Sequence, residues 1–199
     1  MMKKVILFLA IILPIQANPL GSPFERIEIP EKTIAENLRQ ALDKSGRRWS
    51  SRSFERTVSA LHRAEVVYGI DHRIIITLGR VESDMTVWAT GNNRNGTRDY
   101  GWLQVNDCNM EEFQRAAAEI GADPENKYDP ATAVVAAASY LAWSRRELVR
   151  RNQYSISRLI MSYNCGLNGS DHENPRYAHL AEKRSRYWTK FCTKSMEEI

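Results

Sequence analysis

A glutamate stands where a strongly apolar stretch gives way to a polar, glycine-rich one. Glu82 follows Ile74–Leu78 and precedes the loop Gly91–Gly96. A carboxyl at such a junction is partly withdrawn from water, which raises its pKa, and a protonated carboxyl can give its proton to a leaving oxygen. Glycosidic cleavage needs such an acid, because the bridging oxygen leaves poorly until it is protonated. A glutamate at a helix end is more often simply solvated, so Glu82 alone decides nothing.

Two later clusters carry residue types that are common in sugar-binding clefts. The run Tyr100–Gln104 holds a glycine, aromatic rings able to stack on sugar faces, and an amide that both donates and accepts hydrogen bonds. The run Ser162–Gly166 ends a later apolar segment with a similar mixture, including Tyr163 and Asn164. Each cluster is ordinary by itself, since aromatic residues are usually part of a core. Together with Glu82 they indicate a carbohydrate cleft.

The order of these motifs resembles the soluble lytic transglycosylase (SLT) domain family. The resemblance runs from about Ala64 to Tyr187 and is closest to the small secreted members that serve secretion systems, conjugation or phage entry. Those members share a stretch like Asn95–Asp99. The residues that carry the resemblance, in chain order, are Glu82-Ser83, Gly101-Trp102-Leu103-Gln104, Tyr128-Asp129-Pro130, Ser139-Tyr140-Leu141, Ser162 to Gly166, and Tyr177.

The resemblance implies a lysozyme-like α domain that cleaves the β-1,4 bond between N-acetylmuramic acid and N-acetylglucosamine in peptidoglycan strands. Glu82 would act as acid and then base, while the muramyl 6-hydroxyl attacks the anomeric carbon and forms a 1,6-anhydro product. An intramolecular hydroxyl has a high effective concentration, so no positioned water is required. The residues expected around the substrate are Ser83, Gln104, Tyr163, Asn164 and Tyr177, and no metal or cofactor is expected.

Departures from the family pattern leave alternatives open. Trp102 replaces a usual Leu, Leu103 a usual Met and Cys165 a usual Ala, which bears on substrate fit. The stretch from Glu82 to Asn106 also resembles c-type lysozyme, in which a second carboxylate occupies the position of Asp99. Two carboxyls would permit a hydrolytic muramidase, although three cysteines cannot supply the disulfide framework of c-type lysozymes. A structural turn role for Asp99 and a non-catalytic peptidoglycan-binding module are the other possibilities.

The first residues resemble a secretory signal peptide, with a positive start, an apolar run and small residues before a cleavage point. We expect a signal peptide over residues 1–17, cleaved after Ala17, and therefore a periplasmic or secreted protein; an uncleaved anchor is the alternative. Residues 18–52 are predicted as a linker and N-terminal helix, 53–192 as the lysozyme-like domain and 193–199 as a tail. No stable membrane span is expected once the signal is removed.

Apolar spacing predicts a mainly α fold with at most a small β element, preceded by an N-terminal helix. Helices are expected over Thr33–Lys44, from Phe54 to Val67, and from a cap at Asp71 to Ser83. Arg47–Arg56 is expected to be a loop, Gly91–Gly96 to be irregular, and Tyr100–Val105 to be a short strand or extended turn. Further helices are predicted over Met110–Ile120, Pro130–Val149, Ser155–Tyr163 and Pro175–Phe191.

Composition sets limits on partners and cofactors. The 199 residues carry a formal net charge of +4, and the three cysteines and four histidines show no zinc-ligand spacing. Arginine clusters at Arg47–Arg56 and Arg145–Arg151 are compatible with solvated helix faces or anionic cell-wall polymers. A nucleic-acid partner is not expected, because an export signal argues against one and no recognition motif is present. Partners in a secretion, conjugation or phage-entry machine are possible, and Thr33–Arg56 is either a docking segment or extra packing.

Overall fold

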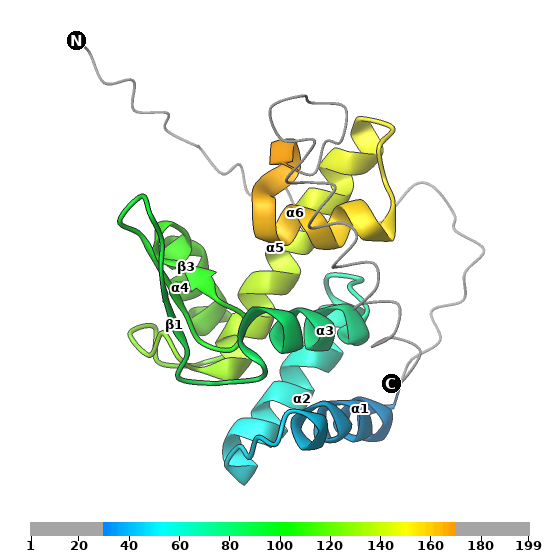
Figure 1. The fold of residues 1–199 in the computed structure, drawn as a ribbon. Coiled ribbons are helices and arrows are strands. Elements are labelled where there is room, and N and C mark those ends of the chain that lie inside the picture. The colour runs from blue at the N-terminus through cyan, green and yellow to red at the C-terminus, as the bar shows by residue number, and fades with distance from the viewer. Residues whose placement is uncertain (1–29, 170–199) are drawn as a thin grey trace.

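The structure is a computed structural model that describes residues 30–169, without the side chains of Cys165 and Asn168. It confirms a mainly helical fold with one small sheet (Figure 1). The predicted signal peptide, the linker before Pro30, Tyr177, the helix over Pro175–Phe191 and the tail lie outside the described residues. Within the described range, no helix combines the length and apolarity that a membrane crossing needs. The helices are α1 (Glu31–Lys44), α2 (Ser51–Val66), α3 (His72–Ser83), α4 (Met110–Glu119), α5 (Pro130–Arg150) and α6 (Ile156–Gly169), and a 3-10 turn spans Asp107–Asn109.

Helix α5 runs through the centre of the molecule (Figure 1). It packs against α2 most extensively and also against α4, α6 and α3. Small residues make this possible: Ala131, Ala133 and Ala136–Ala138 are all buried, so neighbouring helices approach closely on several sides. Asp129 begins α5 by accepting a hydrogen bond from the Thr132 backbone N–H, and Pro130 stands at the favoured first position.

The sequence predicted a loop over Arg47–Arg56, but the second half of this arginine- and serine-rich segment is helical. Helix α2 begins at Ser51, because the Ser50 hydroxyl accepts a hydrogen bond from the Ser53 backbone N–H at 3.1 Å. A serine cluster that looks like a loop is therefore an N-cap. Arg56, inside the helix, is held by both oxygens of the buried Asp129 at 3.1 and 3.2 Å, so one member of the basic cluster stabilises the fold.

A three-stranded antiparallel sheet lies between α3 and α4 in the sequence. It shows that the prediction of an irregular Gly91–Gly96 was wrong for the first two residues. Its strands are β1 (Thr90–Asn92), β2 (Arg98–Tyr100) and β3 (Val105–Asn106), in that order. Gly91 and Asn92, predicted to be irregular, lie in β1, where they pair with Asp99 and Arg98. The irregular part is the turn Asn93–Thr97, in which Gly96 has a φ of +86°. Pairing with β2, a tertiary effect, gives this glycine- and asparagine-rich stretch its regular structure.

Candidate active site

Glu82 is the penultimate residue of α3 and is partly exposed. The helix is apolar and well buried before it, with Ile75, Ile76 and Leu78 each fully inaccessible. The helix ends at Ser83, because the next residue, Asp84, adopts a left-handed conformation (φ 51°). The carboxyl therefore projects from a rigid, packed helix at the point where the chain turns out of the core, as its place in the sequence predicted.

Asn164 meets Glu82 from the far end of the chain. Its Nδ2 donates a hydrogen bond to Glu82 Oε1 at 3.2 Å, joining residues that are 82 positions apart. Helix α6 presents this amide just before Gly166, where the backbone leaves helical geometry (φ 70°, ψ 170°). The structure thus brings together the acid and one member of the Ser162–Gly166 motif, which only the resemblance had linked.

Tyr163 is half-buried and connects α6 to the loop after β2. Its hydroxyl donates to the Leu103 carbonyl at 2.8 Å. Burial raises the pKa of the Tyr163 hydroxyl, and the acidic groups of Glu82, Tyr140 and Asp99 raise it further. The phenol therefore stays protonated, and its main structural service is to tie α6 to the loop that contains Leu103.

Gln104 and Asp99 approach each other over Gly91, with Asp99 in β2 and Gln104 in the turn between β2 and β3. Gln104 adopts a left-handed backbone (φ 49°), and its Nε2 donates to the Gly101 carbonyl at 2.8 Å. A Cβ added at Gly91 would stand 2.9 Å from Gln104 Oε1 and 3.4 Å from Asp99 Oδ2, so the two side chains converge over that glycine. A side chain at position 91 would displace the Gln104 amide.

Asp99 is held by two amide groups. Asn93 Nδ2 donates to its Oδ2 at 2.8 Å, and Asn106 Nδ2 donates to its Oδ1 at 2.6 Å. Both donors come from the sheet and its turn, and Asn106 pairs directly with Asp99 in the strand register. These bonds give Asp99 a structural role within the sheet, and they also fix the carboxylate in one orientation. Neither asparagine was among the residues predicted to form the site.

Ser83 takes a structural position. Its hydroxyl donates to the Trp102 carbonyl at 2.8 Å and accepts a hydrogen bond from the Thr86 backbone N–H at 3.1 Å. It fastens the end of α3 to the loop after β2, which agrees with a turn-capping role. Of the remaining predicted site residues, Tyr177 lies outside the described part of the chain.

Trp102 is not available for stacking on a sugar. Its ring is fully buried, and its indole N–H donates to the Pro130 carbonyl at 3.1 Å. The ring occupies the space above Gly79 in α3, where an added Cβ would lie 2.1 Å from Trp102 Cε3. The aromatic character of this motif therefore belongs to the core. A glycine inside an apolar helix is the sequence signal that indicates such a close approach.

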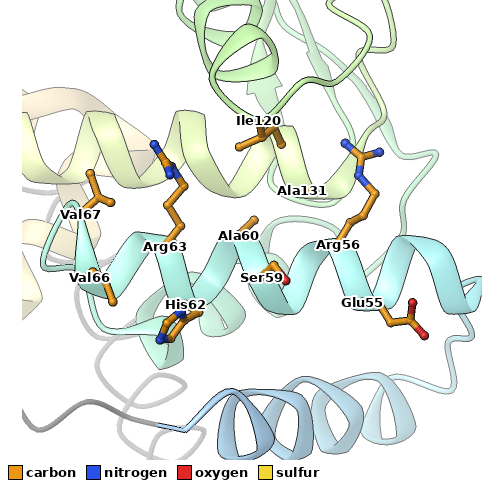
Figure 2. A pocket seen from close by; sticks show the side chains of 10 residues that line it. All are labelled: Glu55, Arg56, Ser59, Ala60, His62, Arg63, Val66, Val67, Ile120 and Ala131. Carbon is orange, nitrogen blue, oxygen red and sulfur yellow. The ribbon is translucent and has the colours of Figure 1, made fainter.

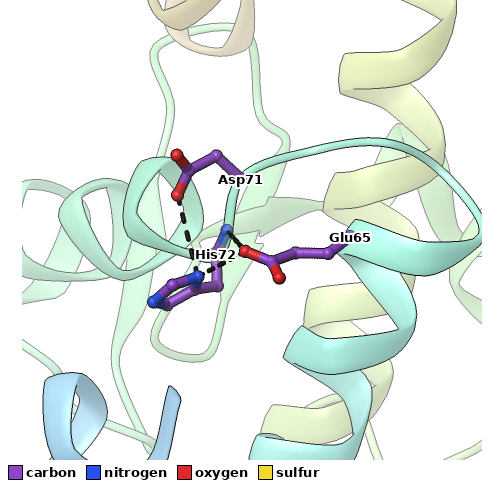
Figure 3. A group of neighbouring side chains, drawn as sticks. All are labelled: Glu65, Asp71 and His72. Atoms are coloured by element: carbon purple, nitrogen blue, oxygen red, sulfur yellow. Dashed lines mark hydrogen bonds and ion pairs between the residues drawn. The ribbon is translucent and has the colours of Figure 1, made fainter. Parts of the chain in front are cut away.

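One group of potential metal ligands occurs among residues 30–169, at the N-terminal end of α3. Glu65, Asp71 and His72 offer ligand atoms within 4.8 Å of one another (Figure 3). Glu65 Oε1 already accepts the His72 backbone N–H at 3.1 Å and contacts the ring Nδ1, while Arg73 donates to both Asp71 oxygens. The His72 Nε2 lies 2.8 Å from the amide of Asn37 on α1. This group connects α1, α2 and α3 through hydrogen bonds.

A pocket of about 550 Å³ lies along α2, bordered by Arg56, Arg63, Val66, Ile120 and Ala131 among others (Figure 2). None of the predicted site residues lines it. Its two arginines already pair with acidic side chains, Arg56 with Asp129 and Arg63 with Glu119 at 2.6 Å. The pocket is therefore separate from the group of residues around Glu82.

Comparison with known proteins gives the same family as the motifs. A family model described as Transglycosylase SLT domain matches residues 59–185. Invasion protein IagB of Salmonella typhimurium, in strains SL1344 and LT2, is 28% identical over 104 residues, 52% of this chain and 60% of the relative. IagB of Salmonella typhi is 28% identical over 80 residues, 40% of this chain and 48% of the relative. The match therefore spans about half to three fifths of these relatives, and no solved structure matches. Because the family model covers more than half of the chain, this protein belongs to the SLT transglycosylase domain family.

Proposed function

We propose that this chain is a peptidoglycan lytic transglycosylase in which Glu82 is the catalytic acid and base. The contact that supports this most directly is the hydrogen bond from Asn164 to Glu82, which unites two family motifs from opposite ends of the domain. The family itself acts on peptidoglycan through lytic transglycosylase chemistry. The export signal expected over residues 1–17 would deliver such an enzyme to the periplasm or the medium.

The position of Glu82 suits a proton donor. The last turn of a helix carries partial negative charge from its unpaired carbonyls and disfavours a second negative charge there. In the first step, the protonated carboxyl gives its proton to the bridging oxygen as the bond from that oxygen to the muramyl anomeric carbon breaks. In the second step, the carboxylate takes the proton of the muramyl 6-hydroxyl while that oxygen bonds to the anomeric carbon. Asn164 holds the carboxyl in place throughout.

Mass spectrometry of the muropeptides released from purified peptidoglycan tests the proposal. Anhydromuramyl ends support a transglycosylase, and their loss in Glu82→Gln with an intact fold assigns the role to Glu82. Glu111→Gln, which neutralises an exposed glutamate on α4, is the matched control and should keep full activity. Appreciable product from pure Glu82→Gln would refute the role. Glycan binding without product would instead indicate a binding module.

Hydrolysis is the second candidate, favoured by one observation. Asp99 is fixed by two amide donors, and its charge, like that of Glu82, raises the pKa of Tyr163, so a second oriented carboxylate acts on the same tyrosine. A hydrolase would leave reducing ends that carry a solvent oxygen. Asp99→Asn separates the two candidates. It should abolish hydrolysis, which needs two carboxylates, whereas a transglycosylase that uses Glu82 alone should still release anhydromuramyl products.

The biological setting is also a proposal. The relatives are named invasion proteins, and the motif resemblance is to small secreted members that serve specialised machines. We infer that this chain opens the wall locally for an envelope-spanning assembly. Deletion of the protein in its own cells should impair assembly of such a machine without changing bulk wall turnover.

A further inference from the structure

The turn that follows Glu82 has an unusual backbone. Asp84 and Met85 have φ angles of 51° and 60°, the left-handed region that side chains other than glycine seldom adopt. Two such residues in succession persist only where surrounding contacts hold them. The orientation of the last turn of α3, and so of Glu82, depends on those contacts.

Part of the support comes from the domain itself. The Met85 backbone N–H bonds to the Gly79 carbonyl at 3.0 Å, and Met85 is fully buried. The Ser83 hydroxyl binds the Trp102 carbonyl. These contacts fix the inner side of the turn. The carbonyls of Asp84 and Met85 take their partners from elsewhere.

Those partners lie in the segment between α1 and α2. Trp49 Nε1 donates to the Met85 carbonyl at 3.0 Å, and Arg47 Nε donates to the Asp84 carbonyl at 3.2 Å. The Trp49 ring also packs edge-on against Trp102, with centroids 5.1 Å apart and planes at 78°. Arg47 adds an ion pair with the Asp84 carboxylate at 3.6 Å, which is exposed and hence weak. The half-buried Trp49 is the stronger support.

Helix α1 holds this segment in register with α3. Asn37 contacts His72 at the start of α3, whereas Arg47 and Trp49 contact the turn at its end. The two partners in each contact are 35, 37 and 36 residues apart in the sequence. This nearly constant separation means that the chain from Asn37 to Trp49 runs parallel to α3, with contacts at both ends of the helix. All of it precedes the residues that match the family model, which begin at 59.

We propose that Arg47 and Trp49 are positioning residues that hold Glu82 in its reactive orientation, so that the segment preceding the SLT domain is part of the catalytic scaffold. The inference rests on the proposed function. On this proposal, Thr33–Arg56 has a specific role, which is to support the turn that follows Glu82.

Single substitutions in the full-length protein test the proposal by steady-state release of muropeptides. Trp49→Phe keeps an aromatic ring but removes the N–H donor, and it should lower kcat at least tenfold with KM changed less than twofold, because no substrate contact is lost. Arg47→Ala should lower kcat less, by about threefold, and Arg47→Lys should recover part of that loss by keeping the ion pair. Arg48→Ala, an exposed neighbour of equal charge, is the matched control and should match wild type.

A second control separates positioning from simple loss of stability. Val58→Ala, in the core on α2, should lower the melting temperature at least as much as Trp49→Phe while leaving kcat intact at temperatures where both are folded. The pH dependence of kcat should shift for Trp49→Phe and remain unchanged for Val58→Ala. If wild type releases no product, the proposed function fails and this inference falls with it. If wild type is active but Trp49→Phe and Arg47→Ala behave like Arg48→Ala or Val58→Ala, the positioning role alone is overturned.

Discussion

Replacing Gly79 by alanine tests whether α3, the helix that carries Glu82, depends on the space that Trp102 fills. A Cβ at position 79 would lie 2.1 Å from Trp102 Cε3 and 2.3 Å from its Cζ3, far inside van der Waals contact. Neither group can move easily, because Gly79 lies in a buried part of α3 and the Trp102 ring is fully enclosed. Either the indole or the end of α3 must move, and Glu82 lies three residues further along.

Two opposing effects set the size of the change. Alanine is a better helix former than glycine by about 1 kcal/mol. Overpacking a dense core costs about 1–3 kcal/mol, and a contact near 2 Å belongs at the upper end of that range. The net loss of unfolding free energy should therefore be about 2 kcal/mol, which corresponds to a fall in Tm of roughly 4–8 °C for a domain of this size.

Urea unfolding followed by circular dichroism measures the effect, and a double-mutant cycle identifies its cause. Trp102→Leu alone should cost about 2–4 kcal/mol, because it empties part of the core. In the double variant, the smaller leucine side chain leaves room for the new methyl group, so the combined loss should be smaller than the sum by at least about 1 kcal/mol. A Gly79→Ala protein as stable as wild type, or more stable, would show that helix propensity outweighs the clash and would refute the reasoning.

Three further perturbations have defined outcomes. Arg56→Ala leaves the buried Asp129 carboxylate without its guanidinium and should lower the unfolding free energy by about 3 kcal/mol, whereas Arg52→Ala, an exposed neighbour, should change it by less than about 0.5 kcal/mol in urea titrations. Burial alone would raise the pKa of Asp71, but hydrogen bonds and charge from Arg73 outweigh it and hold the pKa below its usual 3.8. The stability that Asp71 contributes is therefore present above about pH 4 and is lost as pH falls through the folded-state pKa. In urea titrations at pH 7, Asp71→Asn should have a lower unfolding free energy than wild type, and this difference should narrow below about pH 4. Asn164→Ala removes the donor to Glu82 and should lower kcat at least tenfold with little effect on Tm; an unchanged kcat would deny that the hydrogen bond at 3.2 Å matters.

Local sequence signals predicted most of the helices well. The apolar residues Ile74–Leu78, with a cap at Asp71, indicated α3, and Asp129-Pro130 marked the start of α5 within a residue. These features depend on spacing and capping, which are properties of a short stretch of chain. The order of motifs likewise indicated the family, because it requires no knowledge of contacts.

Features that depend on tertiary contacts could not be predicted in the same way. Gly91 lies in a strand only because Asp99 pairs with it. The residues around Trp49 give no indication that its indole donates a hydrogen bond to the Met85 carbonyl. The sequence alone fits Trp102 both as a platform for sugar stacking and as a core residue, because an aromatic residue beside a glycine is common in both roles. The signal that distinguishes the two roles is Gly79, a residue 23 positions earlier whose missing side chain makes room for the ring.

The burial of this motif changes what its departures from the family pattern mean. A tryptophan in place of a usual leucine, followed by leucine in place of methionine, suggested an altered fit to substrate. Trp102 and Leu103 are both fully enclosed, so neither side chain is available to a sugar. The larger ring instead reaches the Pro130 carbonyl at the start of α5 and the edge of Trp49 in the segment after α1. A leucine could make neither the hydrogen bond nor the edge-on aromatic contact. The substitution therefore acts on the scaffold, because it gives the segment after α1 a surface to pack on beside the turn that follows Glu82. The ring fits there only because Gly79 in α3 has no side chain.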